Sequence, residues 1–119
     1  MKRLITALLI ATFIFSVPFA SHASAKGVKT IRVQSTAYCE KGITATGFNF
    51  NKNPGAKVIA VDPRVIPMFS LVVIPGYGKA IARDTGGRIK GKIIDVHFKT
   101  KHQALQWGRR SVKINVYTF

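Results

Sequence analysis

Acidic residues are scarce in this sequence. Of its 119 residues only four are Asp or Glu, at Glu40, Asp62, Asp84 and Asp95, whereas nineteen are Lys or Arg. Such an excess of positive charge favours an anionic partner through long-range attraction. It also leaves few side chains that could act as a general acid or base, so each of the four carboxylates is a candidate functional group.

Cysteine is nearly absent as well. Cys39 is the only cysteine, so no internal disulfide can stabilise the fold, and the core must hold by packing alone. As a nucleophile Cys39 would need an activating base such as His97 or His102; the alternative is a small buried apolar residue. A zinc enzyme is a weak hypothesis, because the two histidines show no recognised ligand spacing. We therefore expect no metal and no cofactor.

The one long apolar run, residues 4–19, lies at the N terminus. It follows two basic residues and precedes the small-residue segment 23–25, an order typical of a secretory signal. A membrane anchor is the alternative, but the run is shorter than the ~20 residues that a spanning helix needs, and it contains Pro18. We predict that residues 1–25 are a cleaved signal peptide, with no stable membrane insertion afterwards.

Residues 26–119 then form a single domain of 94 residues, too short for two. This part keeps seventeen basic and all four acidic residues, so its formal charge is +13. Nucleic acid would suit that charge, but outside the cell the abundant polyanions are envelope polymers and lipid headgroups. We therefore predict a secreted protein of the cell wall that binds anionic wall polymers and does not bind nucleic acid.

Short β-type runs separated by Gly and Pro follow one another along the domain. Apolar and polar residues alternate around Ile31 and Val33, and similar runs recur as KVIAVD, SLVVIPG, KAIARD, KIIDVHF and SVKINVYTF. Turn-forming segments separate them. The pattern predicts an all-β domain, either a closed barrel or a sandwich, with the segment 26–30 as a flexible lead.

One segment, TKHQALQWG, departs from the β pattern. Thr100 stands at a helix N-cap position, Gln103 at the matching capping-box position, and Gly108 just past the end. The segment therefore predicts a single short helix.

The aspartates occupy distinct places in this pattern. Asp62 and Asp84 each end a β-type run, where they could simply cap a turn. Asp95 lies inside an apolar run, between Ile94 and Val96, where a carboxylate is costly to bury without partners. If it points inward, burial and a second nearby carboxylate would both raise its pKa.

Five ordered segments, TAYC, GITATG, VIAVDPRVIP, GYGKAIARDTGGRIKGKIIDVHF and WGRRSVKINV, closely resemble the three-aspartate (3D) domain of bacterial cell-wall proteins. The resemblance covers about residues 31–118. That family is similar to the catalytic domain of membrane-bound lytic transglycosylase A, which implies a small double-psi β-barrel. One departure is visible, because the family usually has a glycine before Ser70, where this chain has Phe69.

The resemblance implies a peptidoglycan lytic transglycosylase, which cleaves the bond between N-acetylmuramic acid and N-acetylglucosamine (MurNAc-GlcNAc) without water. The 6-hydroxyl of the muramic residue attacks its own anomeric carbon and forms a 1,6-anhydro sugar. One carboxyl can therefore act first as acid and then as base, where ordinary glycosidases need two. Asp95 is the expected catalytic group, Asp84 the neighbour that holds its proton by charge repulsion or by a hydrogen bond, and Asp62 a residue that orients the site or the substrate.

The remaining site predictions concern substrate binding. The predicted contacts are Thr44, Thr46, Gly47, Tyr38 and Lys90. Tyr77 and Trp107 could also stack on sugar rings, although a place in the core is at least as plausible. His97 follows Asp95 by two residues, so both would face the same side of a strand.

A second hypothesis comes from a different class. Double-psi barrels also occur in expansin-like proteins, which bind and loosen wall polymers without cleaving them. The basic surface predicted here would also suit such a binding module.

Overall fold

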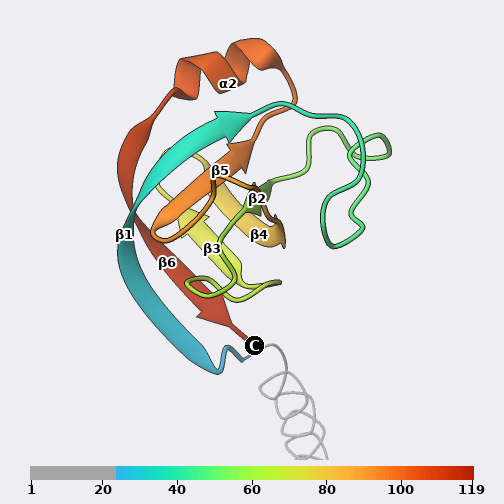
Figure 1. Ribbon diagram of the computed structural model, residues 1–119. Helices are drawn as coiled ribbons and strands as arrows, with labels where there is room; N and C mark the ends of the chain where they lie inside the picture. Colours follow the sequence, from blue (N-terminus) through green and yellow to red (C-terminus); the bar gives the residue numbers. More distant parts are fainter. Residues whose placement is uncertain (1–23) are drawn as a thin grey trace, which may run out of the picture.

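The computed structural model describes residues 24–119, which form six strands and one helix (Figure 1). The elements are β1 (Gly27–Tyr38), β2 (Val58–Ala60), β3 (Leu71–Ile74), β4 (Gly78–Asp84), β5 (Ile93–His97), α2 (Lys101–Trp107) and β6 (Arg110–Thr118). Every β-type run identified in the sequence contains a strand, so the all-β prediction is confirmed. The predicted signal peptide falls almost wholly outside the described residues and stays a prediction.

The strands close into a barrel in the order β1-β5-β2-β4-β3-β6. Two of the neighbouring pairs, β1 with β5 and β2 with β4, run parallel, and the others run antiparallel. A closed barrel leaves no unpaired sheet edge, which is how small all-β domains avoid pairing with other chains. Of the two architectures that the sequence left open, the barrel is therefore correct and the sandwich is wrong.

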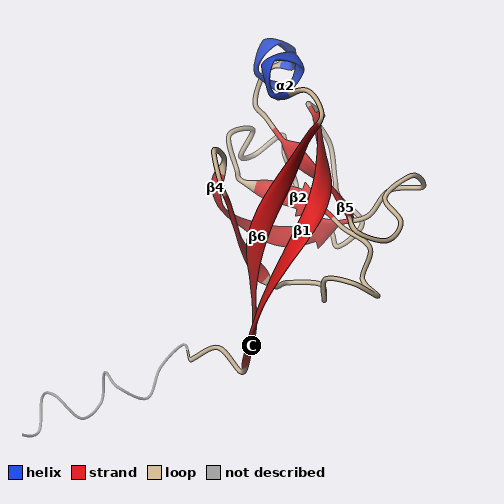
Figure 2. Cartoon of the chain, turned by 90° about the vertical axis from the view of Figure 1, so that its left-hand side faces the viewer, coloured by secondary structure: helices blue, strands red, loops and turns tan. Residues whose placement is uncertain are grey.

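The expectation of a flexible lead at residues 26–30 is wrong. Strand β1 begins at Gly27, which pairs with Thr118 of β6, and the Lys26 amide donates to the Thr118 carbonyl at 2.7 Å. Strands β1 and β6 lie side by side in both Figure 1 and Figure 2 and form a long two-stranded ribbon. This segment has no apolar alternation because it extends beyond the barrel core; backbone pairing with β6 makes it a strand.

The barrel interior is filled by aliphatic side chains from all six strands. Alternate residues of each long strand point inward, as the period of two requires. Ile31 and Val33, whose alternation predicted β1, lie on the same inward face, and Val33 is buried. The apolar side chains with no exposed surface are Ile59, Val61, Val72, Ala82, Ile94, Val96 and Ile114.

The short helix α2 covers one end of the barrel (Figure 1). Thr100 and Gln103 form the predicted capping box, and Gly108 follows the last turn, so the helix prediction is confirmed. Trp107 is buried, and its indole Nε1 donates to Ser35 Oγ at 3.0 Å. Tyr77 is buried beside it, so both rings belong to the core. No helix within residues 24–119 has the length and apolar character needed to cross a membrane.

The departure from the family pattern, Phe69 in place of a glycine, lies in a turn with a left-handed backbone. Phe69 has a φ of 70°, the only positive value among the described residues other than glycine, and its ring is 57% exposed. Its amide donates to the Ala82 carbonyl at 2.7 Å, which fixes the turn onto β4. The turn thus keeps the left-handed backbone conformation that a glycine adopts without strain, and this chain places a bulky side chain there.

We therefore predict that Phe69→Gly stabilises the protein. The left-handed conformation costs a residue with a side chain about 1–2 kcal/mol, and glycine's extra unfolded-state entropy offsets about half of this. The free energy of unfolding in urea should rise by about 0.5–1 kcal/mol. Phe69→Ala is the control, because it removes the same exposed ring but keeps the strained Cβ. Equal stability of the Gly and Ala variants would contradict the prediction.

Candidate active site

A pocket of about 240 Å³ opens on the barrel wall, and it collects most of the acidic residues of the chain. Its lining residues are Tyr38, Glu40, Ile43, Ala60, Asp84, Thr85, Gly86 and Asp95. Three of the four carboxylates thus lie around one small cavity in a protein of strongly positive charge. We call it the acidic pocket.

Strand pairing brings the two pocket aspartates together. Asp95 lies in the middle of β5, in register with Thr36 of β1 on one side and Ala60 of β2 on the other. Ala60 in turn pairs with Asp84 at the end of β4, beside an irregularity in the register. The aspartates therefore sit one strand apart, with the small side chain of Ala60 between them. This proximity depends on the barrel order.

Asp95 is half-buried and faces the pocket, while Ile94 and Val96 on either side of it point into the core. Its Oδ1 accepts a hydrogen bond from Thr36 Oγ1 at 2.9 Å. Its Oδ2 accepts none from the part of the chain that the structure describes. One oxygen is thus fixed in place, and the other is free to carry a proton toward a ligand.

The pKa of Asp95 lies above its ordinary value. Burial is the main cause, because it penalises the charged form. The negative charges of Asp84 and Glu40 raise the pKa further, and the hydrogen bond from Thr36 lowers it, with a smaller lowering by His97. Both causes anticipated from the sequence, burial and a neighbouring carboxylate, are therefore present.

Asp84 is held by three donors. Its Oδ1 accepts from the amides of Ala45 at 3.0 Å and Thr85 at 2.9 Å, and its Oδ2 accepts from the Tyr38 hydroxyl at 3.3 Å. Burial, together with the charge of Asp84, raises the pKa of Tyr38 well above its usual range, so the phenol stays a donor. Asp84 thus caps the turn after β4 and also lines the pocket.

Glu40 is the pocket residue to which the sequence assigned no specific role. It follows β1, its side chain is exposed, and it lines the pocket with Asp84 and Asp95. Its backbone carbonyl is 3.0 Å from His97 Nε2, which positions the chain where it leaves the strand. The scarcity of acidic residues was the only signal in the sequence that pointed to it.

His97 packs behind the pocket, against the lining residue Tyr38 and against Phe50. Its buried ring stacks on Phe50 with a centroid distance of 3.7 Å and meets the edge of Tyr38 at 5.1 Å. His97 is not among the lining residues. Together these rings attach the loop 39–57 to β5, so the contribution of His97 to the site is the position of that loop.

The predicted substrate contacts Thr44, Thr46 and Gly47 lie in the same loop. Thr46 Oγ1 donates to the Arg83 carbonyl at 2.7 Å, and Thr44 Oγ1 accepts from the Phe48 amide at 3.1 Å. Gly47 has a φ of 93°, a conformation that favours glycine. None of the three lines the pocket. In this structure they fix the loop to the end of β4, beside Asp84.

Asp62 lies apart from the other carboxylates and is not a lining residue of the acidic pocket. It is buried, and it accepts hydrogen bonds from the Arg64 side chain at 2.9 Å and from the Gly91 amide at 2.8 Å. The Arg64 guanidinium, followed by the Gly91 amide, holds the pKa of Asp62 well below its usual range. Asp62 thus connects its own turn to the loop before β5, where Lys90 is exposed next to Gly91.

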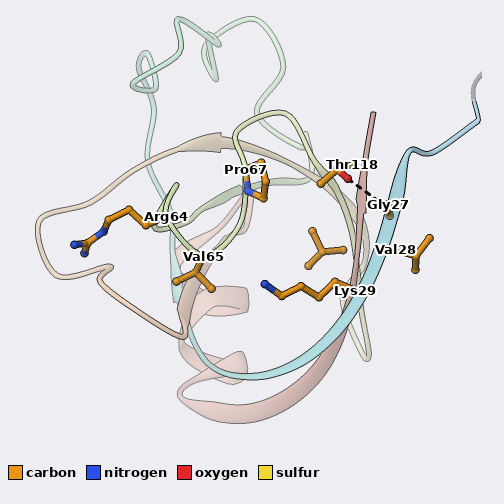
Figure 3. A pocket seen from close by; sticks show the side chains of 8 residues that line it. Gly27, Val28, Lys29, Arg64, Val65, Pro67 and Thr118 are labelled. Carbon is orange, nitrogen blue, oxygen red and sulfur yellow. Dashed lines mark hydrogen bonds between the residues drawn. The ribbon is translucent and has the colours of Figure 1, made fainter.

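A second cavity, of about 370 Å³, has no acidic lining. It lies between the start of β1, the end of β6 and the turn after β2 (Figure 3). Lys29 points into it, whereas the guanidinium of Arg64 points away. Val65, Pro67 and Val116 supply apolar walls. It is larger than the acidic pocket but offers no group for acid–base chemistry.

The single cysteine is half-buried. Cys39 Sγ lies 3.4 Å from the Lys99 carbonyl, as a weak hydrogen-bond donor. Within residues 24–119 no three His, Cys, Asp or Glu side chains lie close enough together to hold a metal ion.

The fold and the acidic pocket define a small β-barrel domain with a carboxylate site on its wall. Residues 57–119 match the family described as the 3D domain. This match covers more than half of the sequence, and the chain belongs to the 3D domain family, as the five sequence segments indicated.

Relatives in Bacillus subtilis (strain 168) are similar over most of this chain. The protein named "Cell wall-binding protein YocH" is 52% identical over 93 residues, and the "Putative cell wall shaping protein YabE" is 54% identical over 93 residues. Each alignment covers 74% of this chain but only 32% and 23% of those proteins. The "SPbeta prophage-derived uncharacterized protein YorM" is 38% identical over 104 residues, 77% of this chain and 44% of its own. This chain thus spans less than half the length of each.

A solved structure supports the fold assignment. The Streptomyces papain inhibitor superposes with a TM-score of 0.56 at 16% sequence identity, over 76% of this chain and 96% of the inhibitor. At this identity the likeness concerns the fold alone. Together with the barrel order and the two parallel strand pairs, it confirms the predicted double-psi β-barrel.

The buried Asp62 yields a prediction about stability. Because its folded-state pKa is depressed, its stabilising contribution is present above the unfolded value near 3.8 and is lost as the pH falls below it. In Asp62→Asn the new amide N–H₂ faces donors from Arg64 or Gly91. The thermal midpoint should therefore fall at neutral pH, and the difference from wild type should shrink below pH 3.8.

Lys90→Gln is the control for that experiment, since Lys90 is exposed on the same loop and forms no ion pair with Asp62. Its midpoint should follow wild type at every pH. A loss in Asp62→Asn that is constant with pH would show that the carboxylate charge does not stabilise the fold.

Proposed function

We propose that this chain is a cell-wall domain that cleaves peptidoglycan glycan strands as a lytic transglycosylase. The observation that carries the proposal is the half-buried Asp95, whose pKa is raised in a pocket shared with two other carboxylates. The printed names of two relatives, cell wall-binding and cell wall shaping, support a cell-wall location. The N-terminal sequence supports export as the route there.

The first half of the reaction needs a protonated carboxyl. Asp95 donates its proton to the glycosidic oxygen as the bond from that oxygen to the anomeric carbon of the muramic residue breaks. The raised pKa favours the protonated form, and Oδ2 accepts no hydrogen bond from the described residues. Thr36 holds Oδ1, so the direction in which Oδ2 points is fixed.

The second half needs the same group as a base. The 6-hydroxyl of the muramic residue attacks the anomeric carbon of its own ring, and the Asp95 carboxylate accepts the hydroxyl proton. A carbon–oxygen bond within the sugar replaces the glycosidic bond, and Asp95 is protonated again. No water is consumed, so no second carboxylate is required to activate one.

The other predicted site residues support Asp95. Asp84 raises its pKa by charge and is fixed in position by the donors around it. Tyr38 offers an aromatic edge in the pocket for contact with a sugar. Asp62 positions the loop before β5 through Gly91. Thr44, Thr46 and Gly47 hold the loop 39–57 in place beside Asp84. Lys90 is exposed, so its charge can attract an anionic polymer.

Asp95→Asn tests the proposal directly. An amide cannot donate and recover the proton, so muropeptides ending in 1,6-anhydromuramic acid should fall at least about 100-fold, the lower range for general acid–base catalysis. Folding should be intact, because Asn removes a charge that burial disfavours. The measurement is mass spectrometry of purified glycan strands, with circular dichroism as the folding control. Retention of more than about a hundredth of the activity would exclude Asp95 as the acid.

Asp84→Asn tests the role of the neighbouring charge. Activity that depends on protonated Asp95 falls as the pH rises through its raised pKa. Removing the Asp84 charge lowers that pKa, so the alkaline limb of the pH–activity profile should move to lower pH. Anhydro-product yield at a series of pH values measures this shift. An unchanged profile would mean that Asp84 acts only as a turn cap.

A non-catalytic function remains the second candidate, because one relative is named a cell wall-binding protein. In an expansin-like module the acidic pocket would bind sugar without transferring a proton. Wild-type protein would then bind insoluble wall but release no anhydro-muropeptide, and Asp95→Asn would bind as well as wild type. Products with ordinary reducing ends would instead indicate hydrolysis.

A further inference from the structure

The outward face of the β1–β6 ribbon carries positive charge without any acidic partner. Ile31, Val33 and Ser35 of β1 face the core, so the even-numbered residues of β1 face outward, as the side chain of Val28 does in Figure 3. Arg32 and Lys113 are directly opposite each other on this face, and both are exposed. Cross-strand partners are only about 5 Å apart at Cα, and like charges in such positions repel.

Nothing in the described part of the chain neutralises this pair. Three carboxylates line the acidic pocket, and the fourth, Asp62, forms with Arg64 the one ion pair among residues 24–119. The polar neighbours of the pair are themselves donors or acceptors. Gln34 and Ser111 form the next cross-strand pair on this face, and the Arg32 guanidinium donates to Ser111 Oγ at 3.2 Å. The face therefore combines two free charges with hydrogen-bonding groups, which suits an anionic ligand.

This face is continuous with the acidic pocket. Residues 32, 34 and 36 of β1 share one side of the strand, and Thr36 donates to Asp95. Four residues of extended chain span about 13 Å, so Arg32 lies within a few sugar rings of the proposed catalytic carboxyl. A polymer with its scissile bond at Asp95 can thus extend along β1 toward Arg32 and Lys113.

We propose that Arg32 and Lys113 bind the carboxylates of peptide stems that branch from the same glycan strand whose bond lies in the acidic pocket. This inference rests on the proposed function and names its substrate more narrowly: strands that still carry stems. A carboxylate placed over the pair relieves the repulsion between the two cations. The stems belong to the bound strand, so this site also fixes which bond reaches Asp95.

The test compares two double variants of equal charge in an Asp95→Asn background, where binding is measured without cleavage. One is Arg32→Gln with Lys113→Gln. The matched control is Lys52→Gln with Lys101→Gln, exposed residues outside the ribbon. The probes are glycan strands with stems, the same strands after the stems have been removed, and poly(glycerol phosphate). Dissociation constants are measured at two salt concentrations.

The ribbon variant should bind stem-bearing strands about five- to tenfold more weakly, the scale of two exposed ion pairs, and the loss should diminish at high salt. Binding to stem-free strands should be unchanged, and the control variant should change less than twofold. The thermal midpoint of the ribbon variant should not fall, because its two substitutions remove a like-charge pair. This comparison stays informative even if no anhydro product is ever formed.

Three outcomes would overturn the inference. Equal losses in both double variants would show that net charge alone attracts the polymer. A loss confined to poly(glycerol phosphate) would identify a phosphodiester polymer as the ligand of the ribbon. No loss with any probe would show that the face binds none of them.

Discussion

The burial of Asp95 beside other carboxylates on one wall of the barrel is the constraint on which the rest of the site depends. Burial raises the pKa of the half-buried Asp95 most, and Asp84 and Glu40 raise it further, so its tendency to hold a proton depends on all three carboxylates. Such a group is costly to assemble. Backbone amides at Asp84 and the Thr36 hydroxyl at Asp95 offset part of the cost of placing these carboxylates together. The positive charge elsewhere on the protein offsets a further part.

The barrel topology determines which residues meet. A parallel pairing places Thr36 beside Asp95, and another places Ala60 beside Asp84, so the pocket lies where these strands adjoin. The loop 39–57 forms the other wall and is held by the rings of Phe50 and His97. Because these contacts come from elements far apart in sequence, the pocket exists only in the closed barrel. The positive ribbon of β1 and β6 continues from the same wall, so opposite charges are separated along one strand.

Local sequence signals predicted the elements better than the site. Apolar alternation and Gly/Pro turns located the strands, and Thr100 with Gln103 located the helix, because these signals act within a few residues. The start of β1 was missed because its pairing with β6 spans most of the chain. Glu40 was missed for the same reason, since only the fold brings it to Asp95. The bond from Gly91 to Asp62 is equally invisible in the sequence, being 29 residues distant.

The central claim is that burial and acidic neighbours together raise the pKa of Asp95, and a carboxyl-detected NMR titration of isotope-labelled protein tests it most directly. The Asp95 carboxyl should titrate above the ordinary aspartate value of 3.8. Its midpoint should fall in Asp84→Asn and fall again when Glu40→Gln is added, because each change removes a negative charge. A wild-type midpoint at or below 3.8, or one that does not respond to either substitution, would contradict the account.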